Sequence, residues 1–169
     1  LTLTLLFSLN INSQTAEEFF YTAIDKSRAK DYVGALNDYN KAIELNPNYY
    51  DAYYNRGVLK YNSSSLYQDL KGAISDFSVV IKHNPKDEDA YYNRAGAKFL
   101  LEDYEGAIND FGKELEINPR NGDAFFMVAP IKKLIGKDGC EDIKKARQLG
   151  VSFPINEVQW DEFFKSNCN

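Results

Sequence analysis

The chain is poor in the residues that build metal centres and nucleophilic active sites. Its 169 residues include one histidine, two cysteines, one tryptophan and one methionine. His83, Cys140 and Cys168 do not have the spacing of a metal-ligand set. No glycine-rich phosphate loop and no nucleophile elbow occurs either. We therefore expect no catalytic residue, no cofactor and no metal, and we assign His83 a structural place near a helix C-terminus.

An excess of positive charge and a long apolar run are also lacking. The net charge is −5 at pH 7, which would repel a phosphate backbone, so no nucleic-acid partner is expected. The one basic stretch, Lys132 to Arg147, is interleaved with acidic residues, as on a solvated helix face. The apolar stretch over residues 1–9 is too short to cross a bilayer, so no membrane span is expected.

The apolar stretch over residues 1–9 has the length of a signal-peptide core. Small and polar residues near Ser13 offer a cleavage site. We therefore interpret residues 1–13 as a signal-peptide remnant and residues 14–169 as the folded domain. That interpretation predicts an exported protein, periplasmic or secreted. The alternative is an apolar first helix of the fold, which would leave a cytoplasmic protein.

The two cysteines allow two interpretations. In an exported chain, Cys140 and Cys168 could form a disulfide that closes the last helices, worth about 3–4 kcal/mol in the loop-entropy model. The alternative is a pair of unrelated thiols.

Three short patterns recur along the chain. The segment from Asp51 to Arg56 returns from Asp89 to Arg94, with fainter copies at 123–126 and 17–20. An Asp followed three residues later by Gly-Ala occurs at 31, 69 and 103, and an Asn-Pro pair occurs at 46, 84 and 118. The last two Asn-Pro pairs are 34 residues apart and the first two are 38 apart. The four extra residues are assigned to a polar turn at Asn62–Ser65.

Each repeat is predicted to hold two helices. Apolar residues recur at helical spacing before and after each Asp-x-x-Gly-Ala pattern. The second helix is predicted to end at each Asn-Pro, because the residue before proline leaves helical geometry and proline has no N–H.

These patterns resemble the tetratricopeptide repeat. The resemblance implies an all-α, right-handed superhelix with three full repeats at 16–49, 50–87 and 88–121. A degenerate repeat would follow at 122–150, and a capping helix at 155–166 would contain Trp160. The short exits and the Lys-rich fourth repeat resemble exported bacterial members of the family.

Four residues depart from the family pattern. Lys26 stands where an aromatic is usual, Gly96 is one place late for the packing glycine, and Glu114 replaces an alanine. Pro130 falls inside the first helix of the fourth repeat, where we expect a kink.

The resemblance implies that the first helices line a concave groove. Groove candidates are Phe20, Ile24, Tyr54, Asn55, Val58, Tyr61, Tyr92, Asn93, Phe99 and Phe126, and an acidic rim is formed by Glu17, Asp51, Asp89 and Asp123. Such a groove suits a peptide or protein with apolar and basic side chains. Alternatively, the rings pack between repeats and the acids favour the helix dipole.

The resemblance implies a non-catalytic scaffold that binds a peptide or protein in this groove. Some family members hold a C-terminal carboxylate through Lys and Asn of the first repeat, but residues 19–24 contain neither, so that mode is rejected. The alternative function is a structural repeat protein that has no peptide ligand and self-associates, with its exposed aromatic surface docked against another copy; repeat proteins with incomplete caps can also stack end to end.

Overall fold

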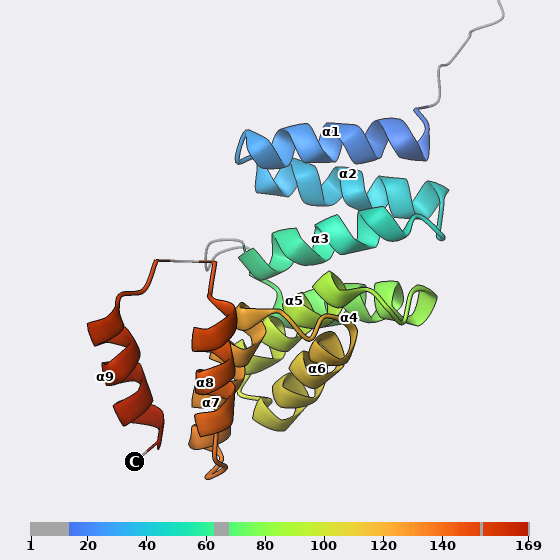
Figure 1. Cartoon of the computed structure of the whole chain (residues 1–169). Helices are drawn as coiled ribbons and strands as arrows, with labels where there is room; N and C mark the ends of the chain where they lie inside the picture. The colour runs from blue at the N-terminus through green and yellow to red at the C-terminus, as the bar shows by residue number, and fades with distance from the viewer. Residues whose placement is uncertain (1–13, 63–67, 153, 169) are drawn as a thin grey trace, which may run out of the picture. The chain divides into compact units, whose positions relative to one another are not determined.

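The computed structural model describes residues 14–62, 68–152 and 154–168, and every regular element in these ranges is an α-helix (Figure 1). The chain divides into two compact units, residues 1–49 and 50–169. The predicted all-α solenoid of helix pairs is confirmed. The proposed signal remnant at 1–13 and most of the proposed turn at Asn62–Ser65 lie outside the described residues.

The described part of the first unit, residues 14–49, is one helix pair. Helix α1 spans Ala16–Arg28 and α2 spans Tyr32–Leu45. Thr15 and Glu18 cap α1 reciprocally, because each side chain accepts the backbone N–H of the other residue. The two helices bury an interface of alanines and aromatic rings, in which the ring centroids of Phe20 and Tyr39 are 6.1 Å apart.

The second unit contains three helix pairs and a final helix. The pairs are α3 (Tyr50–Asn62) with α4 (Leu70–His83), α5 (Glu88–Leu100) with α6 (Tyr104–Ile117), and α7 (Gly122–Leu134) with α8 (Cys140–Leu149). Helix α9 covers Glu157–Cys168 and packs on α7 and α8. It lies two residues later at each end than the predicted capping helix. It starts after Asn156, because the side-chain oxygens of Asn156 and Gln159 each accept the backbone N–H of the other residue.

The recurring Asp-x-x-Gly pattern starts the second helix of three pairs. The carboxylates of Asp31, Asp69 and Asp103 accept the backbone N–H three residues later, at 2.9 to 3.0 Å. The residue that donates is glycine each time, and a Cβ there would meet the capping carboxylate at 2.0 to 2.2 Å. The glycine is therefore explained by the cap as well as by the packing of the adjacent alanine.

The Asn-Pro pairs end the same helices, as predicted. Asn46, Asn84 and Asn118 are the C-caps of α2, α4 and α6. Each asparagine side chain then accepts the backbone N–H two residues later, which turns the chain toward the next first helix.

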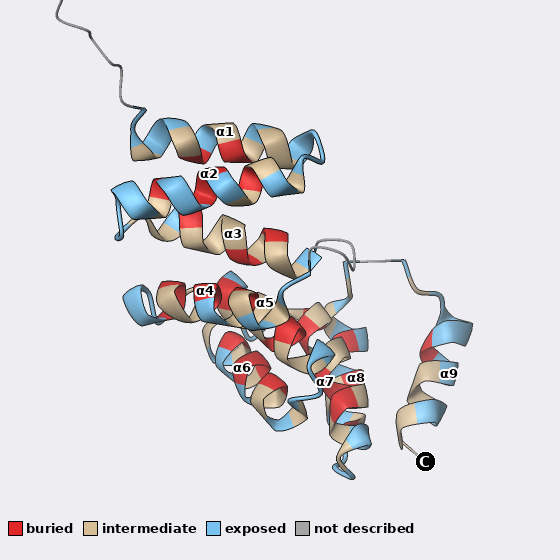
Figure 2. Cartoon of the chain, turned by 180° about the vertical axis from the view of Figure 1, so that it is seen from behind, coloured by how far each residue is buried: buried red, intermediate tan, exposed pale blue. Residues whose placement is uncertain are grey.

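The core of the second unit lies between neighbouring helices, where buried residues line the facing sides (Figure 2). The alanines at the closest approaches are fully buried, and Phe77 and Phe111 fill the space beside them. Pro130 does not end α7, which continues to Leu134. No helix in the described ranges has the length and apolar character needed to cross a bilayer.

Candidate functional site

The predicted groove residues of the second unit lie on α3, α5 and α7, the first helices of their pairs. We call this surface the first-helix face; it contains Asp51, Tyr54, Asn55, Val58, Tyr61, Asp89, Tyr92, Asn93, Phe99, Asp123 and Phe126. The other three candidates lie in the first unit. There Glu17 is exposed, Ile24 is half-buried, and Phe20 is only 8% exposed and packs against Tyr49 with ring centroids 4.8 Å apart.

The rings of the first-helix face are half-buried, and those on α3 contact α5. The hydroxyl of Tyr54 accepts a hydrogen bond from Asn93 Nδ2 at 3.1 Å. A Cβ added at Gly96 would lie 2.5 Å from the Tyr61 hydroxyl, so this glycine makes room for that ring. The departure of Gly96 from the family pattern thus has a packing cause.

The same rings also reach the core of their own helix pair. Tyr54 meets Phe77 edge-on at 5.9 Å between centroids, and Tyr92 meets Phe111 in the same way at 5.4 Å. Burial, followed by the negative charges of Asp89 and Asp87, raises the pKa of Tyr54 to about 12. Burial also raises the pKa of Tyr61 and Tyr92. The hydroxyls therefore stay protonated at neutral pH.

Phe126 and Phe99 differ from the tyrosines in what they contact. Phe126 is covered by α9, because Phe163 stacks on it with centroids 4.1 Å apart and Trp160 meets it edge-on. Phe99 lies 6.0 Å from the ring of Tyr104 on α6.

The predicted acidic residues of the second unit stand in the first turns of α3, α5 and α7, where the helix dipole favours negative charge. Asp51 and Asp89 are exposed. Asp123 is half-buried and accepts the backbone N–H of Ser152 at 2.7 Å. Their positions fit both the rim interpretation and the dipole interpretation.

Asn55 and Asn93 use their amide nitrogens within the protein. Each Nδ2 donates to the backbone carbonyl four residues earlier, at 2.8 Å. Within the described part of the chain, no hydrogen bond reaches the Oδ1 atom of either residue, and both side chains are half-exposed. The two oxygens are acceptors open to a ligand N–H.

Sequence reasoning missed a lysine–aspartate ion pair that recurs in all four helix pairs. The pairs join the first helix to the second: Lys26 to Asp38 at 2.6 Å, Lys60 to Asp76 at 2.9 Å, Lys98 to Asp110 at 2.8 Å and Lys132 to Asp142 at 2.6 Å. Lys26 is therefore a regular member of this series. The sequence signal for these ion pairs was a lysine at the same position in each of the four repeats.

Two of these pairs are reinforced by arginine. Arg56 binds both carboxylate oxygens of Asp76, and Arg94 binds both oxygens of Asp110 at 2.7 and 2.8 Å. Arg94 also donates to the Ser78 hydroxyl at 2.9 Å, which links the second helix pair to the third. The buried carboxylates of Asp76 and Asp110 are both paired with cations and accept hydrogen bonds at both oxygens, so we assign them a structural role.

Glu114 is a buried carboxyl with an incomplete set of partners. It is 1% exposed, its Oε1 accepts Asn121 Nδ2 at 2.8 Å, and its Oε2 has no hydrogen-bond partner. Burial, with the charges of Glu88 and Asp89, raises the pKa of Glu114 to about 7. Because Asn121 also caps α7, the carboxyl sits where the third pair meets the fourth.

The structure joins Cys140, at the start of α8, to Cys168, at the end of α9, by a disulfide with Cα atoms 5.3 Å apart. Two ion pairs of Arg147, with Glu157 and Asp161, hold the other end of α9 to α8. Helix α9 is thus fixed at both ends.

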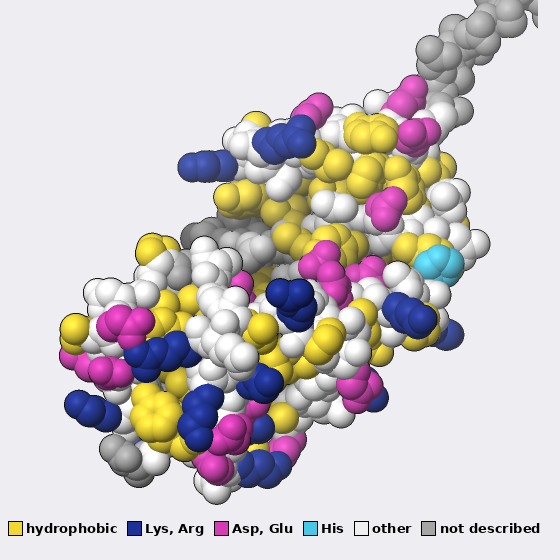
Figure 3. Space-filling model, in the orientation of Figure 1, with side chains coloured by type: hydrophobic (Ala, Val, Ile, Leu, Met, Phe, Trp, Pro, Cys, Tyr) yellow, Lys and Arg dark blue, Asp and Glu magenta, His cyan; other side chains and the backbone are white. Residues whose placement is uncertain are grey.

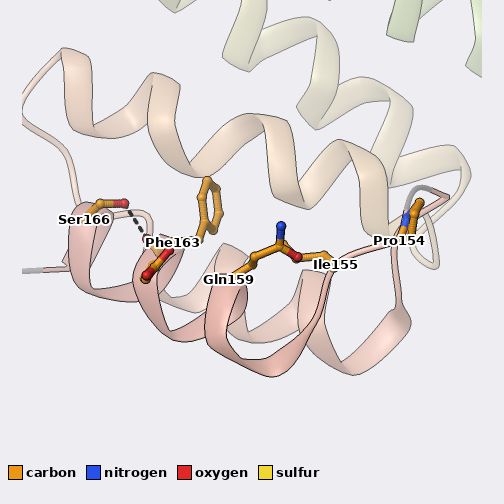
Figure 4. Close-up of a pocket in the computed structure, with 6 residues that line it drawn as sticks. Pro154, Ile155, Gln159, Phe163 and Ser166 are labelled. Carbon is orange, nitrogen blue, oxygen red and sulfur yellow. Dashed lines mark hydrogen bonds between the residues drawn. The ribbon is translucent and has the colours of Figure 1, made fainter.

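A pocket of about 420 Å³ opens on α9 (Figure 4). It is lined by Pro154, Ile155, Gln159, Glu162, Phe163 and Ser166. Gln159 and Phe163 point to the same side of the helix. No pattern in the sequence had indicated this site.

Elsewhere the charges are dispersed. On the face shown in Figure 3, Lys and Arg side chains of the second unit lie between Asp and Glu side chains. His83 stacks on Tyr50 with ring centroids 3.6 Å apart. Within residues 14–62, 68–152 and 154–168, no group of three or more His, Cys, Asp or Glu side chains is placed to hold a metal.

The chain is similar to known repeat proteins. Residues 29–63 match the family model described as "TPR repeat", and no curated protein matches the chain in sequence. The solved structure of MamA residues 41 to the end from Desulfovibrio magneticus RS-1 is 21% identical, with a TM-score of 0.74, covering 82% of this chain and 77% of that chain. Another MamA crystal structure is 16% identical, with a TM-score of 0.70, covering 86% and 91%.

A third similar structure contains a ligand. The first TPR domain of Spaghetti (RPAP3), bound to the HSP90 peptide SRMEEVD, is 23% identical with a TM-score of 0.66, and the match covers 76% of this chain and 99% of that chain. At these identities the three structures establish a shared fold.

Proposed function

We infer that this chain is a tetratricopeptide-repeat protein, and we propose that it is a non-catalytic scaffold whose first-helix face holds a peptide segment of another protein. The observation that carries the proposal is the pair of open acceptors, the Oδ1 atoms of Asn55 and Asn93, at equivalent positions on α3 and α5. Two acceptors repeated along stacked helices suit the regularly spaced N–H groups of a peptide backbone.

The side chains around these acceptors support a ligand with apolar and basic residues. Tyr54 and Tyr92 offer half-exposed ring surface beside them. Asp51 and Asp89 are exposed one helical turn earlier and attract positive charge. Because part of each ring is already buried in the protein, the asparagines and the acids contribute the specificity and the rings contribute contact area.

The similar structure that holds a peptide allows a comparison of ligand charge. The peptide held by Spaghetti (RPAP3) carries two glutamates, one aspartate and a C-terminal carboxylate. The acidic residues of the first-helix face would repel such a ligand. We therefore expect this chain to prefer the opposite charge.

The test uses three fluorescein-labelled peptides and fluorescence anisotropy. A decapeptide of alternating Leu and Lys is expected to bind, whereas its Leu–Glu counterpart and SRMEEVD are not. Asn55→Ala removes one ligand hydrogen bond and should weaken Leu–Lys binding about fivefold. Asn109→Ala, on the exposed side of α6, is the matched control. Equal binding of all three peptides, or equal losses in both variants, would refute the proposal.

We also propose that the protein acts outside the cytoplasm. The disulfide between Cys140 and Cys168 supports this, because such bonds persist in oxidising compartments. Thiol titration of protein taken from its source cells tests it. Two free thiols per chain would contradict export.

Self-association without a peptide ligand is the second candidate. The observation that favours it is the exposure of Leu100, Leu101 and Leu134 at the ends of α5 and α7. Light scattering over a concentration series separates the two candidates, since a strict monomer would remove the second.

A further inference from the structure

Helices α3 and α5 show how one first helix packs on the next. Two tyrosines seven residues apart on α3, Tyr54 and Tyr61, face two residues three apart on α5, Asn93 and Gly96. The first contact is a hydrogen bond, and the second is the close approach of the Tyr61 hydroxyl to the glycine.

Helix α9 packs on α7 in the same register. The equivalents of the two tyrosines on α7 are Phe126 and Lys133, again seven residues apart. Phe126 stacks on Phe163, and Lys133 Nζ donates to the Ser166 carbonyl, so the contacted residues are again three apart. Helix α9 therefore occupies the place of a fifth first helix.

This register assigns each residue of α9 to a position on a first helix. Gln159 corresponds to Asp89 and Glu162 corresponds to Tyr92. Trp160, which corresponds to the fully buried Ala90, is itself only 5% exposed, as the register requires. The first-helix face thus continues across α9 with different chemistry.

The pocket on α9 lies at these continued positions. Four of its six lining residues, Gln159, Glu162, Phe163 and Ser166, occupy the positions that on α5 hold Asp89, Tyr92, Asn93 and Gly96. The wall is apolar at Ile155 and Phe163 (Figure 4). It is acidic at Glu162. This combination suits a side chain with a hydrocarbon stem and a positive end.

The charge of Glu162 is available to such a side chain. The other two acids of α9, Glu157 and Asp161, both pair with Arg147 on α8. Within the described residues, the Glu162 carboxylate makes no hydrogen bond or ion pair, and its side chain is exposed.

We propose that this pocket receives a lysine or arginine side chain of a peptide lying along the first-helix face. The proposal rests on the proposed function and adds the residue class bound at the C-terminal end of the face. The stem of the basic side chain would lie on Ile155 and Phe163, and its positive group would reach Glu162.

The test locates the peptide and measures its charge preference. The photoreactive residue p-benzoylphenylalanine replaces Ile155, and mass spectrometry reads which residue of the Leu–Lys decapeptide it captures. We expect capture next to a lysine. Replacing the lysines of the peptide by norleucine should weaken binding to the wild type more than to Glu162→Gln, because only the wild type has a charge to satisfy in the pocket. Glu162→Lys should weaken Leu–Lys binding about fivefold.

Glu102→Lys is the matched control, since it makes the same charge change at an exposed carboxylate that, among the described residues, makes no hydrogen bond or ion pair and does not line the pocket. Trp160 emission shows whether α9 stays docked in each variant. Peptide binding without capture at residue 155, or equal effects of the two charge reversals, would overturn the pocket assignment alone. Failure of every peptide to bind the wild type would overturn the proposed function and this inference together.

Discussion

Removal of Arg94 should destabilise the second unit more than removal of its neighbour Lys98. Asp110 is 0% exposed, accepts two charged hydrogen bonds from Arg94 and forms an ion pair with Lys98. The two hydrogen bonds from Arg94 are 2.8 and 2.7 Å long, and among the described residues no other group donates to Oδ1. Lys98 Nζ lies 2.8 Å from Oδ2, which Arg94 also binds. The Arg94→Met variant therefore leaves a buried carboxylate oxygen without a partner, while Lys98→Met does not.

The expected magnitudes follow from this difference. Breaking a buried pair by removal of one partner costs about 3–5 kcal/mol. Because Lys98 remains beside Asp110, we expect about 3 kcal/mol for Arg94→Met. The Lys98→Met variant should cost about 1 kcal/mol, because it removes one ion pair from a carboxylate that keeps both hydrogen bonds from Arg94.

Urea unfolding followed by circular dichroism measures both values. The triple variant Arg94→Met/Lys98→Met/Asp110→Leu removes all three charges and should recover most of the lost stability. Two results would refute the reasoning: a Lys98→Met loss as large as that of Arg94→Met, or a triple variant no more stable than Arg94→Met.

Three further predictions concern stability. The pKa of Glu114 is raised to about 7 in the folded protein, so the free energy of unfolding should fall by about 3 kcal/mol as the pH rises from about 4.5 to 7. Urea unfolding at several pH values measures this fall, and Glu114→Gln should remove it. Gly96→Ala should cost about 1–3 kcal/mol by displacing a tyrosine hydroxyl, whereas Gly112→Ala, with open space around it, should gain up to about 1 kcal/mol in thermal unfolding. Cys140→Ser should cost about 3–4 kcal/mol and shift Trp160 emission to the red as α9 loosens.

Most of the fold was predictable because its signals are local. The Asp caps, the glycines that follow them and the Asn-Pro ends are all short patterns, and each fixes a helix boundary through hydrogen bonds within a few residues. The departures from the family pattern were visible too, but their reasons were not. Gly96 is explained only by the Tyr61 hydroxyl above it, which belongs to another helix pair.

The candidate site was only partly predictable for the same reason. The sequence placed Tyr54, Tyr92 and Phe126 at one repeat position, but their environments depend on what packs next to each. The buried ion pairs were missed because a lysine on an amphipathic helix resembles a surface residue until its partner on the second helix is known. The α9 pocket required the register of α9 on α7, which no local pattern encodes.

The ion pairs also bear on how the number of helix pairs in such a chain can change during evolution. Each lysine–aspartate pair is completed within its own helix pair, and the bond from Arg94 into the preceding pair ends on a neutral hydroxyl, Ser78. Duplication or loss of one whole helix pair during evolution would therefore leave each of the other lysine–aspartate pairs intact. The gene could gain or lose whole helix pairs, whereas a break between the two helices of one pair would leave an aspartate without its lysine.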